Sequence, residues 1–295
     1  MELWLNRGNL VQQNEWEYAV DSLRSSTKSF YRMKTQCLAA VETQLVSAVQ
    51  KRIPAQKFCV FLSGGVDSSL LALLSKKLHG DFIVVTVGVK DSPDMKSSQT
   101  MADALGVEWI SLELTESDCE KLAKKALSIL PVTLHDPVSV GISVVVIAAV
   151  EVAWKQGIAY FIGGLGAEEL FAGYKRHLDA ADVHEECWNG LRNMWTKDLV
   201  RDAALGGALG ITVATPFLDA ELIQAAMRVP GKWKIVDGER KVILREVAEK
   251  LGVPHSLAWR KKQAAQYGSG VDKMIEKLAK RKQMTKSAYI TSLAH

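Results

Sequence analysis

A glycine-rich segment near residue 60 carries the residue types that could bind a phosphate. It spans Phe58–Ser69 and reads FCVFLSGGVDSS, an apolar run followed by small and polar residues. Gly64 and Gly65 would let the main chain approach a ligand closely, and successive N–H groups at a helix start attract anions. Three side chains add short hydroxyl donors: Ser63, Ser68 and Ser69. We predict a pyrophosphate-binding loop between a strand and a helix.

A carboxylate stands in the same loop. Asp67 would repel a phosphate unless a cation lay between them, so its position predicts bound Mg²⁺. The alternative interpretation is a glycine turn that only joins a strand to a helix. The number of matching positions disfavours it.

Strand and helix patterns alternate around this loop. Apolar runs predict strands at 58–62, 82–89, 107–114 and 159–163, and amphipathic segments predict helices near 68–78, 97–105, 117–129 and 140–155. A helical pattern over about 15–53 precedes them. We therefore predict an α/β fold with a doubly wound parallel sheet, and we expect its ligand outside the carboxyl ends of the strands.

After residue 174 the pattern is mainly helical. Helical segments lie near 185–203, 220–227, 241–251 and 271–282, with one candidate strand at 211–214. We expect three parts: a helical segment over 1–54 that leads into the fold, an α/β core over 55–174, and a helical part over 175–295. The last part should pack against the sheet and help to close the active site.

Composition and charge indicate a globular protein. Of 295 residues 48% are hydrophobic and 24% charged, and a net charge of +4 without a clustered patch does not favour nucleic-acid binding. The N-terminus lacks the basic and apolar regions of a signal peptide, and the most apolar run, 138–154, is interrupted by Gly141, Ser143 and Glu151. We expect a cytoplasmic protein with no membrane partner.

The loop at 63–69 resembles that of the ATP pyrophosphatases, enzymes that cleave ATP between its α and β phosphates. It lacks the lysine of the other common phosphate loop, GxxxxGK[ST]. The resemblance implies an adenine nucleotide α-hydrolase-like fold, with transfer of AMP and release of pyrophosphate.

Further segments narrow the resemblance to one family. They are VGVKDSPD at 87–94, GGLGAEELFAGY at 163–174, TPFLD at 215–219, KVILRE at 241–246 and AWRKK at 258–262. In this order, together with the loop, they resemble the synthetase domain of asparagine synthetases over roughly residues 40–270.

The resemblance implies a nucleotide site. Phe61 and Val87 would form an apolar floor for adenine, with Gly88 exposing main chain to the base; for the Val87-Gly88 pair the alternative is a strand that simply ends in glycine. Gly163 and Gly164 would let a second loop fold against the nucleotide.

The resemblance also implies a metal site and two lysines. Glu168 stands where the family has a magnesium-binding Asp, which makes Asp67 and Glu168 the predicted metal ligands. Lys241, one helical turn before Arg245, is expected to contact pyrophosphate, the alternative being a solvated charged face.

Lys262 matches a lysine that the family places over the α-phosphate. Asp67, Lys241 and Lys262 are the predicted catalytic residues, whereas Arg260 and Lys261 are expected to face solvent.

Residues that would handle the acceptor depart from the family pattern. Leu165 stands where the family has a glutamate between two glycines, and Gly141 stands where it has an arginine. Thr212 and Ala214 replace another Glu and Arg. No leucine side chain can contact a polar substrate or manage a proton as the glutamate does, so these changes argue for a different acceptor or substrate.

The family's glutaminase domain has no counterpart ahead of the loop, so we expect the nitrogen from free ammonia, an amine or a separate glutaminase subunit. The leading hypothesis is an ATP- and Mg²⁺-dependent ligase that adenylates a carboxylate and transfers the acyl group to ammonia or an amine. A homodimer is compatible with this reading. The alternative is a non-catalytic or regulatory ATP-binding subunit. A tRNA-modifying enzyme is disfavoured because Cys37, Cys59, Cys119 and Cys187 form no pair.

Overall fold

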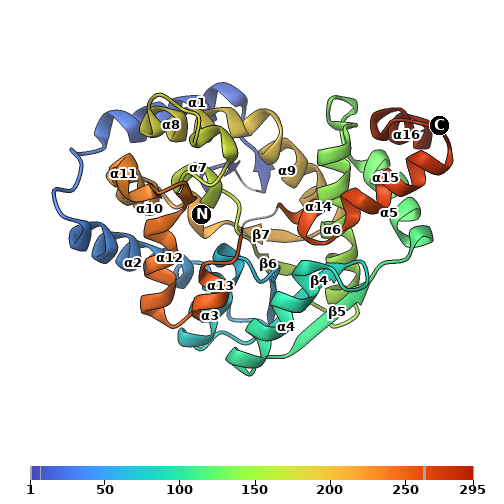
Figure 1. Cartoon of the computed structure of the whole chain (residues 1–295), viewed down its shortest axis with the longest axis horizontal. Helices are drawn as coiled ribbons and strands as arrows, with labels where there is room; N and C mark the ends of the chain where they lie inside the picture. Colours follow the sequence, from blue (N-terminus) through green and yellow to red (C-terminus); the bar gives the residue numbers. More distant parts are fainter. Residues whose placement is uncertain (1, 7, 262–263, 295) are drawn as a thin grey trace.

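A five-stranded parallel sheet forms the centre of the molecule (Figure 1). The computed structural model describes residues 2–6, 8–261 and 264–294. The strands lie in the order β5-β4-β3-β6-β7, and every neighbouring pair is parallel. Their bounds are β3 Phe58–Phe61, β4 Phe82–Gly88, β5 Trp109–Glu113, β6 Tyr160–Ile162 and β7 Thr212–Ala214. The predicted doubly wound α/β fold is confirmed.

Alternate residues of each strand enter two separate cores because side chains along a strand point to opposite faces. Phe58 and Val60 of β3 pack on one face, whereas Cys59 packs on the other. The helices of the first face are α1 Gln13–Ser26, α2 Lys34–Gln50, α3 Val66–Lys77, α4 Pro93–Leu105, α7 Ala167–Leu170, α8 Val183–Asn193, α10 Ala220–Met227, α12 Val242–Leu251 and α13 His255–Ala258. Those of the second are α5 Glu116–Ile129, α6 Pro137–Trp154, α9 Asp198–Leu209, α15 Val271–Arg281 and α16 Lys286–Leu293.

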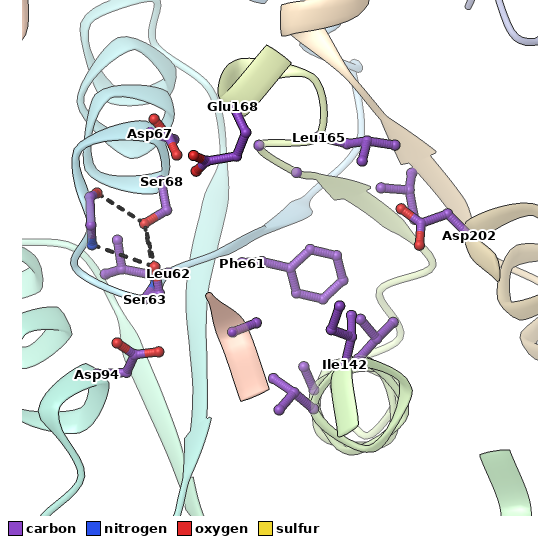
Figure 2. A pocket seen from close by; sticks show the side chains of 18 of the residues that line it. Phe61, Leu62, Ser63, Asp67, Ser68, Asp94, Ile142, Leu165, Glu168 and Asp202 are labelled. Carbon is purple, nitrogen blue, oxygen red and sulfur yellow. Dashed lines mark hydrogen bonds between the residues drawn. The ribbon is translucent and has the colours of Figure 1, made fainter. Parts of the chain in front are cut away.

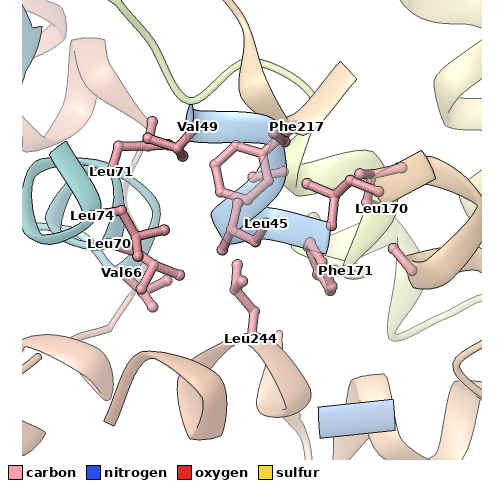
Figure 3. Close-up of a cluster of buried hydrophobic side chains, with 14 of the residues drawn as sticks. Leu45, Val49, Val66, Leu70, Leu71, Leu74, Leu170, Phe171, Phe217 and Leu244 are labelled. Atoms are coloured by element: carbon pink, nitrogen blue, oxygen red, sulfur yellow. The ribbon is translucent and has the colours of Figure 1, made fainter. Parts of the chain in front are cut away.

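The first core joins segments that are far apart in the sequence (Figure 3). Leu45 of α2 lies among Leu70 of α3, Phe171 after α7 and Leu244 of α12, and all four side chains are fully buried. Burying a leucine or phenylalanine contributes about 2 kcal/mol. This core therefore ties α2 and α12 to the helix that begins at the predicted phosphate loop.

Several boundaries differ from the sequence prediction, and two of the differences have local reasons. The helical segment expected over 15–53 is divided into two helices. The hydroxyls of Ser25, Ser26 and Thr27 donate to carbonyls four residues back, a bond that competes with the helix and favours its end. Helix α6 begins at Pro137 rather than at 140 because Asp136 accepts from the Val138 and Ser139 amides.

The helix expected over 185–203 is likewise divided, into α8 and α9. The strand at β7 is present and pairs with β6, so the helical half supplies one edge of the sheet.

The remaining elements are short. They are the hairpin strands β1 Leu5–Asn6 with β2 Asn9–Leu10 and β8 Ile235–Val236 with β9 Glu239–Arg240, the helices α11 Gly231–Lys234 and α14 Ala265–Gly268, and the 3-10 turns 132–134, 175–177, 194–196 and 216–218. By length and composition α6 could cross a membrane, but 56% of it is buried inside the fold. That burial is the pattern of a core helix.

Candidate active site

A cavity of ≈ 280 Å³ opens where β3, β4 and β6 end at their carboxyl side, with Val213 of β7 in its wall. This is where ligands bind in open parallel sheets. Figure 2 shows Ser63, Asp67 and Asp94 on one side of it and Leu165, Ile142 and Asp202 on the other. We call the first side the loop end and the second side the apolar end.

The loop end is organised by hydrogen bonds within 63–68. The Ser63 amide donates to Ser68 Oγ at 3.2 Å, and the Ser63 and Ser68 hydroxyls lie 3.1 Å apart. Gly64 has φ +67°, and a Cβ there would lie 2.5 Å from the Ser97 carbonyl carbon, so only glycine fits. Gly65 is the N-cap of α3. The loop thus presents main chain at a helix N-terminus, as a phosphate site requires.

The two predicted metal ligands meet at this end although 101 positions separate them in the sequence. Lys241 Nζ donates to both Asp67 oxygens, at 2.9 and 2.7 Å, and to Glu168 Oε1 at 2.5 Å. Two hard carboxylates that converge beside a phosphate loop fit Mg²⁺, which keeps several waters and uses one or two carboxylates. Across the described ranges, no group of three or more His, Cys, Asp or Glu is arranged to hold a metal.

Lys241 does not occupy the helical position expected of it. It is the N-cap of α12 and has a left-handed backbone, φ +59°, unusual for a residue with a side chain. Its side chain is 1% exposed and does not line the cavity. The backbone turn directs the ammonium toward the two carboxylates rather than toward solvent, so the solvated-face alternative is wrong.

Most of the predicted nucleotide-binding residues line the cavity: Phe61, Ser63, Gly65, Asp67, Ser68, Val87, Gly163 and Gly164. Phe61 points into the cavity and stacks on Phe161, with ring centroids 4.9 Å apart. Three predicted positions do not line it. Gly88 packs against Ser92 and the Ser269 carbonyl, and Ser69 is fully buried because it follows Ser68 by a third of a helical turn. Gly64 is the third of these positions, and it packs closely against the Ser97 backbone.

Arg260 belongs to the site, contrary to the expectation that it faces solvent. Its guanidinium donates to the Ser63 carbonyl at 2.7 Å and to Asp94 Oδ1 at 2.8 Å. Arg245 lines the cavity too and donates to the Ala258 and Arg260 carbonyls at 2.5 and 3.0 Å. Both arginines lie within motifs noted in the sequence, 241–246 and 258–262. The spacing of charged residues in these motifs did not show which side chains would face the cavity.

The segment after Arg260 is described only in part. Lys261 is exposed at the rim of the cavity. Lys262, the predicted α-phosphate contact, lies outside the described residues.

The apolar end holds a second charge cluster that the sequence did not reveal. Arg201 Nε donates to Asp202 at 2.7 Å, and Nη1 donates to Asp198 at 2.9 Å, all within α9. Burial raises the pKa of Asp202 and Asp198 adds to this, while Arg201 opposes it. Only the tertiary fold brings this helix to the cavity, so no sequence motif pointed to it.

Two more ionisable groups border the cavity. Burial, Asp198 and Glu168 together raise the pKa of Glu169 to about 7. Tyr174 hydrogen-bonds Glu169, and burial raises the pKa of its phenol. Glu169 lies in the first turn of α7.

Comparison with known protein families agrees with this site. The family model described as asparagine synthase matches residues 40–182 and 177–292. The chain belongs to the asparagine synthase family. The match includes the loop, both metal-ligand candidates and α9, which means that both ends of the cavity lie within the family domain.

Curated members of the asparagine synthase family are similar over most of this chain. A Methanocaldococcus jannaschii protein with the provisional name asparagine synthetase 1, glutamine-hydrolyzing, is 29% identical over 280 residues, covering 82% of this chain and 51% of its own length. Escherichia coli asparagine synthetase B, glutamine-hydrolyzing, is 27% identical over 294 residues, covering 91% of this chain and 50% of its own length. The chain thus spans about half the length of these relatives.

Among solved structures, NMN synthetase from Francisella tularensis superposes with a TM-score of 0.46 at 14% identity, covering 87% of this chain and 92% of its own.

Proposed function

We propose that this chain is an ATP- and Mg²⁺-dependent ligase that adenylates a carboxylate, releases pyrophosphate and transfers the acyl group to ammonia or an amine. The observation that carries the proposal is the convergence of Asp67 and Glu168 beside the loop at 63–68, at one end of a single cavity. Membership of the asparagine synthase family supports an ATP-dependent ligase.

The loop end would hold the triphosphate. Main-chain amides of the loop and the N-terminus of α3 would cradle the pyrophosphate portion. The charges of Arg245 and Arg260 lie on the same side and favour an anion there. Phe61 and Val87 offer an apolar surface to adenine.

Asp67 and Glu168 would hold the magnesium ion, which neutralises charge on the phosphates when bound. Lys241 would keep the two carboxylates together before the nucleotide arrives, since its ammonium already contacts both. We propose that Lys262 neutralises charge at the α-phosphate.

The reaction has two steps. A carboxylate oxygen of the acid attacks the α-phosphorus of ATP, the bond from that phosphorus to the β-bridging oxygen breaks, and pyrophosphate leaves with the electron pair. The lone pair of the nitrogen then attacks the acyl carbon, the bond from carbon to the AMP oxygen breaks, and AMP leaves with that pair. One proton passes from the nitrogen to solvent.

The second candidate is an ATP-binding subunit without catalytic activity. It is favoured by Leu165, which lines the cavity where the family has an acid. Incubation with ATP, Mg²⁺, ammonium and a panel of carboxylic acids separates the two. We expect acid-dependent release of AMP and pyrophosphate in equal amounts. ATP binding by calorimetry with no release for any acid would favour the binding subunit.

The nitrogen donor is tested in the same assay. We expect ammonium or a primary amine to support amide formation, and glutamine to do so only when a glutaminase is added. Amide formed from glutamine by the pure chain would contradict this.

A further inference from the structure

The apolar end of the cavity is an aliphatic chamber built from four separate segments. We call it the acyl chamber. Its walls are Ile142, Val145, Val146 and Ala149 of α6, Leu165 of the 163–166 loop, Leu205 of α9, and Ile211 and Val213 beside and within β7. In Figure 2, Leu165 and Ile142 lie on opposite sides of the space beyond the Phe61 ring. The acyl chamber and the loop end are adjacent parts of the same cavity.

Helix α6 presents a continuous apolar stripe to this chamber. Residues 142, 145, 146 and 149 follow the spacing i, i+3, i+4, i+7 that places side chains on one helical face. Ile142, Val145 and Val146 keep intermediate exposure although the rest of the helix is largely buried. Part of the surface of these three side chains therefore faces the cavity instead of being covered by neighbouring side chains.

The polar groups of the chamber would repel a second carboxylate. Arg201 is held by Asp198 and Asp202, so these three side chains together carry more negative than positive charge. An additional buried carboxylate would meet repulsion from these acids as well as the cost of its own desolvation.

We infer that the acid substrate carries one carboxylate and an apolar body, with its carboxylate at the loop end and its hydrocarbon in the acyl chamber. The inference rests on the proposed function, because it names the acid that the proposed adenylation would use. Branched aliphatic monocarboxylic acids match the walls best, since each apolar wall residue contacts the hydrocarbon without leaving a polar atom unpaired. Dicarboxylic acids would be rejected.

Two matched pairs of acids test the effect of a second carboxylate on adenylation. Leucine and aspartate share one skeleton, as do 4-methylpentanoate and succinate, and within each pair an isopropyl group replaces a carboxylate of similar shape. The second pair lacks the amino group. Exchange of labelled pyrophosphate into ATP by the full chain with Mg²⁺ measures adenylation of each acid without any nitrogen donor.

We expect the isopropyl acid of at least one pair to be used about tenfold or more efficiently, by kcat/KM, than its dicarboxylic counterpart. Equal or better use of aspartate or succinate would overturn the inference and leave the proposed adenylation standing. Exchange with none of the four acids, by protein that binds ATP, would also overturn the inference, whereas the proposed function fails only if no acid of the wider panel supports pyrophosphate release.

A variant pair tests the chamber wall itself. Leu165→Asn keeps the forked shape of the side chain but adds polar atoms, and we expect it to lower kcat/KM for the preferred isopropyl acid about tenfold with the KM for ATP unchanged. Leu178→Asn alters a leucine that is 40% exposed and should change neither value. Val213→Thr, which is isosteric, provides a second wall variant. Unchanged acid preference in both wall variants would refute the chamber's role.

Discussion

Each end of the cavity holds one buried cation between two carboxylates, but the two clusters are assembled differently. At the loop end Lys241 joins Asp67 and Glu168, which come from α12, α3 and α7. At the apolar end Arg201 joins Asp198 and Asp202, and all three lie on α9. The first cluster depends on three elements meeting, whereas the second is largely satisfied within one helix.

The difference indicates which cluster can respond to a ligand. A lysine ammonium is a compact charge that a metal ion and phosphates can displace or join. An arginine held by neighbours one and three residues away is fixed by the helix itself and serves to neutralise its partners. We therefore expect the cluster at the loop end to rearrange when ligands bind, and the cluster on α9 to keep its arrangement.

The largest expected effect is on catalysis at the loop end. Asp67→Asn should lower Mg²⁺-dependent pyrophosphate release about a thousandfold, because the metal loses a charged ligand where transition-state charge develops. Glu168→Gln should have the same effect more weakly. Asp21→Asn, at an acid that is 56% exposed, is the control and should be silent. Release at the parental rate by the Asp67 variant would show that the metal assignment is wrong.

The next effect contrasts the two buried cations. Lys241→Met should lower the free energy of unfolding by about 3 kcal/mol, because two largely buried carboxylates lose their shared cation. Millimolar Mg²⁺ should restore much of this loss, since a divalent ion can replace the ammonium. Thermal unfolding with and without Mg²⁺ measures both quantities.

Arg201→Met is the matched control for that experiment. It should also destabilise the protein, but by less, because Asp198 and Asp202 are 27% and 18% exposed and can contact water. Mg²⁺ should not rescue it. If Mg²⁺ restored the stability of both variants equally, the two clusters would not differ in their response to a ligand.

A third prediction concerns the basic run beyond Arg260. Lys262→Ala should cost about 3 kcal/mol in kcat, roughly a hundredfold, with a small change in the KM for ATP. Lys261→Ala should be nearly silent because that side chain is exposed at the rim. Steady-state pyrophosphate release compares the two, and equal small losses would favour the non-catalytic alternative.

The smallest expected effect is the pH dependence contributed by Asp202. Its pKa in the folded protein is raised by burial and by Asp198, so between its unfolded and folded values the folded state binds more protons. This acid therefore contributes less stability as the pH rises through that window. Asp202→Asn should gain stability relative to the parent over the same rise, by up to about 1 kcal/mol.

Urea unfolding at a series of pH values between 4 and about 8 checks this prediction. Asp21→Asn, whose parent residue is exposed, should follow the parent curve at every pH. A free energy of unfolding of the Asp202 variant that falls relative to that of the parent as the pH rises would contradict the assignment of the shift.

Local sequence determined the loop and the elements around it. The apolar run at 58–61, the paired glycines and the polar residues after them allow few conformations, because glycine is required where the chain must turn with positive φ. Apolar periodicity located the parallel strands and most of the helices, and the motifs located Asp67, Glu168 and Phe61 in one site. The elements depend on residues that are close in the sequence, whereas Asp67 and Glu168 were assigned to one site through the resemblance to asparagine synthetases.

Tertiary structure alone decided the rest of the site. The turn at Lys241 and the burial of Arg260 against Ser63 depend on contacts between residues 73 to 197 positions apart, and α9 reaches the cavity only through the packing of the whole helix. Such contacts follow from the packing of complete elements on the sheet. Leu165 was recognisable as a departure from the sequence, but only the fold showed that it joins α6 and β7 in one apolar wall.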